Sequence, residues 1–116
     1  MQVTQLQQIV VDALEALKAK DIIILDVSQL TTIADKMVFC SGTSNRHVKS
    51  LAKNVIDELR QHQIKPFGLE GETDGEWVLV DCSDIIVHVM LPKIREFYQL
   101  EKLWDTSPHP TSKAKD

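Results

Sequence analysis

Two groups of side chains in this sequence have the types that phosphoryl-transfer enzymes use. Asp35, Asp81 and Asp84 carry carboxylates that could hold a divalent metal ion. Residues 41–44, Ser-Gly-Thr-Ser, lie between an expected strand and an expected helix start, where backbone amides and the helix dipole could receive a phosphate. A nucleotidyltransferase-type enzyme would combine these two groups, and this function remains open as an alternative.

The spacing of these residues argues against catalysis. No second carboxylate follows closely after Asp35, and the glycine turn lacks both the glycine spacing and the lysine of a phosphate-binding loop. Asp81 and Asp84 flank a turn, which they would shape while staying hydrated. His88 has aliphatic neighbours and no third group that would orient it toward a nucleophile. We therefore predict no catalytic residue, no cofactor and no metal site.

The most informative pattern is a pair of apolar runs, residues 76–81 and 84–91, separated by Cys82 and Ser83. If the runs pair as a hairpin around these two residues, Trp77 lies opposite His88. Alternation then gives an aliphatic face, which suits packing under helices: Val78, Val80, Ile85, Val87 and Val89. The second face mixes aromatic, apolar and ionisable groups: Trp77, Leu79, Ile86, His88 and Met90, with Asp81 and Asp84 near the turn. Because Cys-Ser lacks the Gly or Asn of tight turns, a bulge there would shift the pairing.

The second face is a candidate binding surface, because protein interfaces favour aromatic and methionine side chains with a charged rim. Between Pro66 and Pro92 the chain has six acidic residues and no Lys or Arg. Such a surface would attract a basic protein rather than a phosphate backbone, although the acids could also merely solvate loops. We predict partner contacts, with Trp77 as the anchor, from Trp77, Leu79, Asp81, Ile86, His88, Met90 and Glu70.

The C-terminal segment 95–104 is dense in large side chains and has two interpretations. In the first, it is clamped on the sheet by Phe97, Leu100, Leu103 and Trp104. In the second, Arg95 and Tyr98 extend the binding face through a planar charge and an amphipathic ring. Both interpretations stay open, and Arg95 and Tyr98 are included among the predicted partner-binding residues.

The elements that must position these residues follow from hydrophobic periodicity. Thr4 and Gln7 have the form of a capping box, and apolar residues at helical spacing predict a helix over residues 5–18. Ser44 is placed to cap a second helix. Strands are predicted at 21–27, with both faces covered, and at 37–40, 66–70, 76–81 and 84–91, and Pro92 can begin a short helical segment. The order α-β-β-α-β-β-β predicts a single α/β domain with helices mainly on one face of the sheet.

Composition narrows the protein class. The 116 residues, 43% hydrophobic and 26% charged, are typical of one globular domain that folds alone. No secretory signal or span of about 20 apolar residues is apparent, so we expect a cytoplasmic protein without membrane contact. A net charge of −4 argues against nucleic-acid binding. Cys40 and Cys82 are expected to be buried free thiols, and residues 106–116 a disordered tail.

Several separated motifs resemble one known family. They are Ile33-Ala34-Asp35, residues 40–48, Glu70-Gly71, residues 77–81, Val87-His88-Val89 and residues 95–104. In this order, over about residues 4–105, the chain resembles the ribosomal silencing factor (RsfS, or Iojap-like) family. Two departures are Lys36-Met37, where an aromatic pair is usual, and Ser83, where a glycine is common.

The resemblance implies a mixed five-stranded sheet like a nucleotidyltransferase core without its catalytic acids, in a domain spanning residues 1–105. It also implies binding to the large ribosomal subunit through ribosomal protein number fourteen, with little direct nucleic-acid contact. Such binding would sterically block joining of the small subunit and repress translation under nutrient limitation. A homodimer is expected in isolation, and a dimeric adaptor without ribosomal function remains a further alternative.

Overall fold

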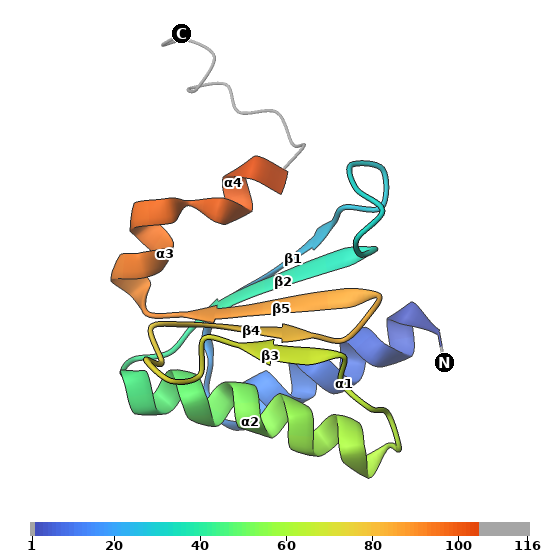
Figure 1. Cartoon of the computed structure of the whole chain (residues 1–116), viewed down its shortest axis with the longest axis horizontal. Coiled ribbons are helices and arrows are strands. Elements are labelled where there is room, and N and C mark those ends of the chain that lie inside the picture. Colours follow the sequence, from blue (N-terminus) through green and yellow to red (C-terminus); the bar gives the residue numbers. More distant parts are fainter. Residues whose placement is uncertain (1, 105–116) are drawn as a thin grey trace, which may run out of the picture.

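A five-stranded mixed sheet with the strand order β1-β2-β5-β4-β3 organises the chain (Figure 1). The computed structural model describes residues 2–104, with side chains as far as Lys102, so the predicted tail at 106–116 lies outside the described residues. The elements are α1 (Val3–Ala16), β1 (Lys20–Asp26), β2 (Lys36–Ser41), α2 (Asn45–Gln61), β3 (Gly68–Glu70), β4 (Trp77–Asp81), β5 (Ile85–Met90), α3 (Pro92–Tyr98) and α4 (Leu100–Trp104). The predicted element order and the predicted α/β class are confirmed.

The sheet separates two layers of helices. β2 and β5 pair in parallel, and the other neighbouring strands pair antiparallel. The long helices α1 and α2 cover one face, whereas the short helices α3 and α4 lie on the other (Figure 1). The larger apolar cluster lies under α1 and α2, and a smaller one, which includes Phe39 and Met90, lies on the opposite face. The long helices are therefore on one face, as predicted.

Helix α1 begins earlier than predicted. Its N-cap is Gln2, whose backbone N–H donates to the side chain of Gln5 at 3.1 Å, so the capping box predicted for Thr4 and Gln7 is wrong. The apolar stripe that was predicted from periodicity does face the sheet, with buried Leu6, Val10, Ala13 and Leu14. The spacing of apolar residues predicted the buried face of the helix correctly, because that face is the one that packs on the sheet. The cap was harder to predict, because several polar residues near the start of the helix could serve as the N-cap.

Helix α2 matches its prediction closely. The hydroxyl of Ser44 accepts a hydrogen bond from the backbone N–H of His47 at 3.1 Å and so caps the first turn. The imidazole of His47 accepts from Thr43 N–H at 2.9 Å and also lies 2.7 Å from the Leu17 carbonyl, which joins the start of α2 to the end of α1. The predicted apolar positions are buried: Val48, Leu51, Ala52, Val55, Ile56 and Leu59.

Strand β1 differs from its prediction. The continuous apolar run suggested a strand covered on both faces, but β1 is an edge strand, and Ile23 and Ile24 are each 36% exposed. The central position belongs to β5, all six residues of which are buried. A continuous apolar run cannot distinguish an edge strand from a central one, because strand order depends on pairing between segments distant in sequence.

Candidate functional site

The loop between β4 and β5 sets the register of the hairpin. Trp77 lies opposite Met90 and Leu79 opposite His88, so the predicted pairing of Trp77 with His88 is wrong by two residues. The predicted turn at Cys82 and Ser83 is displaced by one residue: Asp81 pairs with Ile86, and the Cys82 N–H donates to the Ile85 carbonyl at 2.9 Å, so the chain reverses at Ser83 and Asp84. Ser83 adopts a left-handed φ of 74°, the conformation that a glycine would favour there. Ser83 is the one residue of this turn with a left-handed φ.

Both predicted faces survive the register error, because a shift of two residues leaves the alternation of side chains unchanged. The aliphatic face belongs to the cluster under α1 and α2: Val78, Val80, Ile85, Val87 and Val89. The mixed face lies on the opposite side of the sheet, where Trp77, Leu79, Ile86 and Met90 belong to the second cluster. Trp77 is therefore not beneath the long helices.

Three aromatic side chains gather where β4 meets α3. The ring centroids of Trp77 and Tyr98 are 5.2 Å apart, and the ring of Phe97 stands edge-on to Tyr98 at 4.9 Å. Phe97 is 78% exposed and Tyr98 51%, while Trp77 is partly buried. We call Trp77, Phe97 and Tyr98 the aromatic patch. Its exposed rings form an apolar surface of the kind that binding sites use.

Three of the predicted contact residues lie beneath this surface rather than on it. Ile86 is 7% exposed, His88 6% and Met90 0%. They lie on the predicted face, but β5 is the middle strand of the sheet and α3 and α4 lie over this face (Figure 1). The alternation of side chains correctly predicted which face these residues lie on. It could not predict how deeply they are buried, because burial depends on which segments fold over the sheet.

His88 links the buried layer to the aromatic patch. Its Nδ1 accepts a hydrogen bond from the Trp77 indole N–H at 3.2 Å, and its ring stacks on Phe39 at 4.7 Å with an interplanar angle of 8°. An indole nitrogen only donates, so the proton of the neutral imidazole is on Nε2. Nε2 is buried and has no hydrogen-bond partner among the described residues. Burial lowers the pKa of His88 from 6.5 to about 4.

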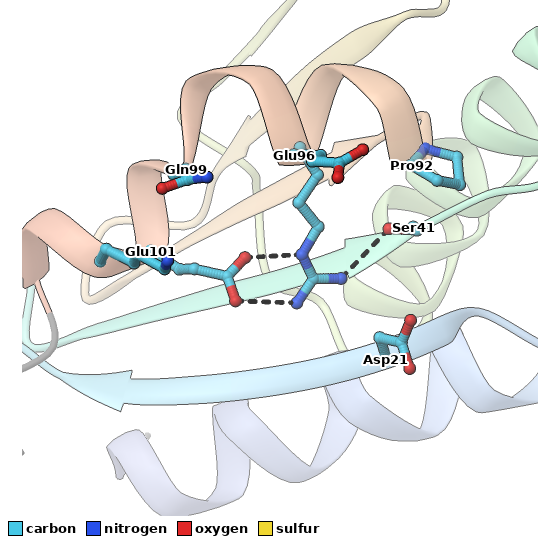
Figure 2. Close-up of a pocket in the computed structure, with 8 residues that line it drawn as sticks. Asp21, Ser41, Pro92, Glu96, Gln99 and Glu101 are labelled. Atoms are coloured by element: carbon cyan, nitrogen blue, oxygen red, sulfur yellow. Dashed lines mark hydrogen bonds and ion pairs between the residues drawn. The ribbon is translucent and has the colours of Figure 1, made fainter. Parts of the chain in front are cut away.

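Arg95 fastens the C-terminal helices to the sheet instead of facing solvent. Its Nε donates to Glu101 Oε1 at 2.6 Å, and its Nη1 donates to Ser41 Oγ at 3.1 Å (Figure 2). The Arg95 side chain is only 10% exposed. Gln99, at a left-handed φ of 50°, ends α3 and turns the chain so that Glu101 can reach back to Arg95. A cavity of about 260 Å³ lies beside this ion pair and is lined also by Asp21 and Lys102.

The structure separates the residues that each of the two open interpretations of the C-terminal segment had grouped together. Arg95, through Ser41, and the partly buried Leu100 hold the segment on the sheet, whereas Phe97 is exposed. The side chains of Leu103 and Trp104, which the first interpretation also named, lie outside the described residues. Tyr98 extends the exposed surface, as its amphipathic ring suggested. The interpretation that clamped Phe97 on the sheet and the one that placed Arg95 on the binding face each differ from the structure at that residue, because both were argued from single side chains without their partners. The available signal was Glu101, an acidic partner that allows a buried arginine.

Two acidic residues, Glu70 and Asp81, lie on the same face of the sheet as the aromatic patch. Glu70 pairs with Leu79, which places Glu70 on that face, where it is exposed. Asp81 lies further along β4 on the same face, and its carboxylate accepts from Ser83 N–H at 2.9 Å, so it also shapes the turn as predicted. Glu76, next to Trp77, is exposed as well.

Gly71 determines the position of the start of β4 and was not among the predicted site residues. It has a left-handed φ of 85°, and a Cβ built on it would lie 2.1 Å from the Trp77 carbonyl oxygen. Any other residue here would push the start of β4 and therefore displace Trp77. Only the Glu70-Gly71 motif in the sequence pointed to this position.

The backbone and side chains of the 41–44 loop and the two cysteine thiols have other roles in the fold. In the 41–44 loop, Thr43 N–H donates to His47 and Ser44 caps α2. Cys40 and Cys82 are buried free thiols, and burial raises the pKa of each to about 12. Within residues 2–104, no cluster of three potential metal ligands occurs, and no helix is long and apolar enough to cross a membrane.

The buried His88 predicts a pH-dependent stability. Its pKa is lower in the folded protein than in the unfolded chain, so the unfolded chain takes up the proton first as the pH falls below 6.5. As the pH is lowered from 6.5 to 4, the free energy of unfolding should therefore decrease in the wild type. This decrease should exceed the decrease in His88→Asn by up to about 3 kcal/mol. Urea unfolding across this range measures the difference. Val87→Ala, which lowers stability without removing a titratable group, should keep the wild-type slope, and equal slopes for wild type and His88→Asn would contradict the prediction.

Comparison with known proteins identifies the family. The family model described as "Ribosomal silencing factor during starvation" matches residues 1–116. A ribosomal silencing factor RsfS from Chromobacterium violaceum is 45% identical over 104 residues, covering 90% of this chain and 85% of the relative. One from Haemophilus influenzae is 41% identical, covering 85% of this chain and 97% of the relative.

Solved structures agree with the fold described above. A crystal structure of a Chromobacterium violaceum protein matches with a TM-score of 0.89 at 44% identity, covering 94% of this chain and 92% of that one. A Bacillus halodurans structure matches with a TM-score of 0.81 at 31% identity, covering 91% and 99%. The chain belongs to the ribosomal silencing factor family, whose members are regulators of translation and not enzymes.

Proposed function

We propose that this protein binds the large ribosomal subunit through ribosomal protein number fourteen and sterically blocks joining of the small subunit. It would thereby repress translation in the cytoplasm when nutrients are limited. Family membership supports this proposal. A mouse relative, 34% identical over 89 residues that make up 39% of its length, is named "Mitochondrial assembly of ribosomal large subunit protein 1", which also connects this fold with the large subunit.

The aromatic patch is the observation that carries the proposal. Phe97 and Tyr98 expose large apolar rings beside the partly buried Trp77. Exposed aromatic rings cost a free protein solvation energy and are favoured as anchors in interfaces. The proposed contacts are Trp77, Leu79 and Tyr98 of the predicted set, together with Phe97.

The acidic residues on this face of the sheet support a basic partner. Glu70 and Asp81 lie on the face of the aromatic patch, and Glu76 adjoins Trp77 in sequence. Lysine and arginine side chains would be attracted by these carboxylates and could also lie against the aromatic faces. A phosphate backbone would be repelled. This arrangement supports contact with a ribosomal protein rather than with ribosomal RNA.

Co-sedimentation with separated ribosomal subunits tests the function. The wild-type protein should sediment in a sucrose gradient with large subunits and not with small subunits. Prior incubation of large subunits with the protein should reduce the fraction of joined ribosomes formed when small subunits are added. A protein that stays at the top of the gradient with both subunits would contradict the proposal.

Trp77→Ala tests the surface. If Trp77 is an anchor, the variant should bind isolated large subunits more weakly by about 2 kcal/mol or more, which is roughly 30-fold in Kd. Titration of labelled protein against large subunits measures this change. Phe67→Ala is the matched control, because Phe67 is also an exposed aromatic residue (75%) but lies at the opposite end of β4, beside Asp81. Equal losses for both variants would remove the aromatic patch as the binding surface.

We also propose that the free protein forms a homodimer. The family resemblance supports it, and so does the exposed apolar area at Phe97 and Tyr98, which a second copy could cover. Light scattering should then give a mass that increases from monomer to dimer with concentration. A monomer mass throughout the micromolar range would contradict a dimer, and a dimer without ribosome binding would favour the adaptor alternative.

A further inference from the structure

The indole of Trp77 is held from inside the protein. Its only polar atom, Nε1, points inward and donates to His88 Nδ1, while its ring contacts Tyr98 on the outer side. Because a hydrogen bond is directional, it restrains the rotation of the planar indole in addition to the packing around it. The surface that Trp77 presents to a partner therefore depends on where His88 places its acceptor nitrogen.

His88 itself has little freedom to move. It lies on the buried strand β5, directly opposite Leu79 on β4 and Phe39 on β2. Its ring is stacked nearly parallel on Phe39, and the stack is enclosed by the smaller apolar cluster. The acceptor is therefore supported by the middle of the sheet and not by a surface loop.

Stability alone does not explain a histidine at this position. Its neighbours on the same face of β5 are the apolar Ile86 and Met90, and its Nε2–H is buried without a partner among the described residues. A buried unsatisfied donor is unfavourable, and an apolar side chain of similar size would avoid it. A residue kept at such a cost is expected to serve function.

We propose that His88 is a positioning residue: it does not touch the partner, and it orients the Trp77 indole for binding through its Nδ1 acceptor. This inference rests on the proposed ribosomal function for its affinity readout. It departs from the sequence prediction that His88 contacts the partner directly. In this proposal the Trp77 indole N–H needs a hydrogen-bond acceptor at the position of His88 Nδ1, and His88 Nε2 makes no contact with the partner.

The test compares two substitutions at the same position. His88→Leu fills the site and removes the acceptor, whereas His88→Asn places its side-chain oxygen near the position of Nδ1. His88→Leu should bind large subunits at least about 10-fold more weakly while its Tm stays equal to or above that of the wild type. His88→Asn should recover affinity to within about 3-fold of the wild type even if its Tm is lower. Val87→Ala, which is destabilised on the other face of β5, should bind like the wild type at a temperature where it is folded.

A second readout does not depend on ribosomes. In ¹H–¹⁵N spectra, the Trp77 indole N–H signal, assigned by its loss in Trp77→Ala, should exchange faster with solvent in His88→Leu than in the wild type or in His88→Asn. This measurement also decides the outcome should the Asn variant fail to fold. The inference is overturned if His88→Leu binds as tightly as the wild type, or if its affinity and Tm fall together with unchanged indole exchange. Failure of the wild type itself to bind would instead reject the proposed function.

Discussion

The burial of β5 on both faces is the constraint on which the rest of this structure depends. The strand pairs in parallel with β2 and antiparallel with β4, and all of its residues are buried. Its odd-numbered positions face α1 and α2, and its even-numbered positions face the smaller apolar cluster. Because neighbouring strands must alternate in phase with β5, this one strand decides that Trp77 and Leu79 lie away from the long helices.

The same constraint explains how much of the fold could be read from the sequence. Periodicity gave the element order, the buried stripe of α2 and the two faces of the hairpin, because each follows from burial on a fixed local repeat. It did not give the register of β4 against β5 or the edge position of β1. Register depends on a turn in which Ser83 takes an unusual φ, and strand order depends on pairing between distant segments. A register error of two residues was harmless here, whereas an error of one would have exchanged the faces.

The sequence predicted which face of the sheet the candidate site residues lie on, but not how deeply each one is buried. Trp77 and Tyr98 were expected at the surface, and their rings do meet there. Arg95 was expected partly as a surface charge, and it is instead a buried link from α3 to Ser41 and Glu101 (Figure 2). Single-residue hydrophobicity cannot anticipate such an exchange, because a charge becomes tolerable in the interior only when a partner is brought to it by the fold. On the same helix, the apolar Phe97 is exposed while the charged Arg95 is buried.

A protein that acts by occupying a surface needs a rigid contact area more than it needs chemistry. Most of its affinity must come from a few side chains whose orientation is fixed before binding, since ordering them during binding would consume part of the interaction energy. Three parts of the fold support the aromatic patch: His88 on the buried strand β5, the Gly71 backbone in the turn before β4, and the Arg95–Glu101 pair, which joins α3, the helix that carries Tyr98, to α4. The polar groups of this fold are thus used to hold a surface in place, which is consistent with a family of regulators that perform no reaction.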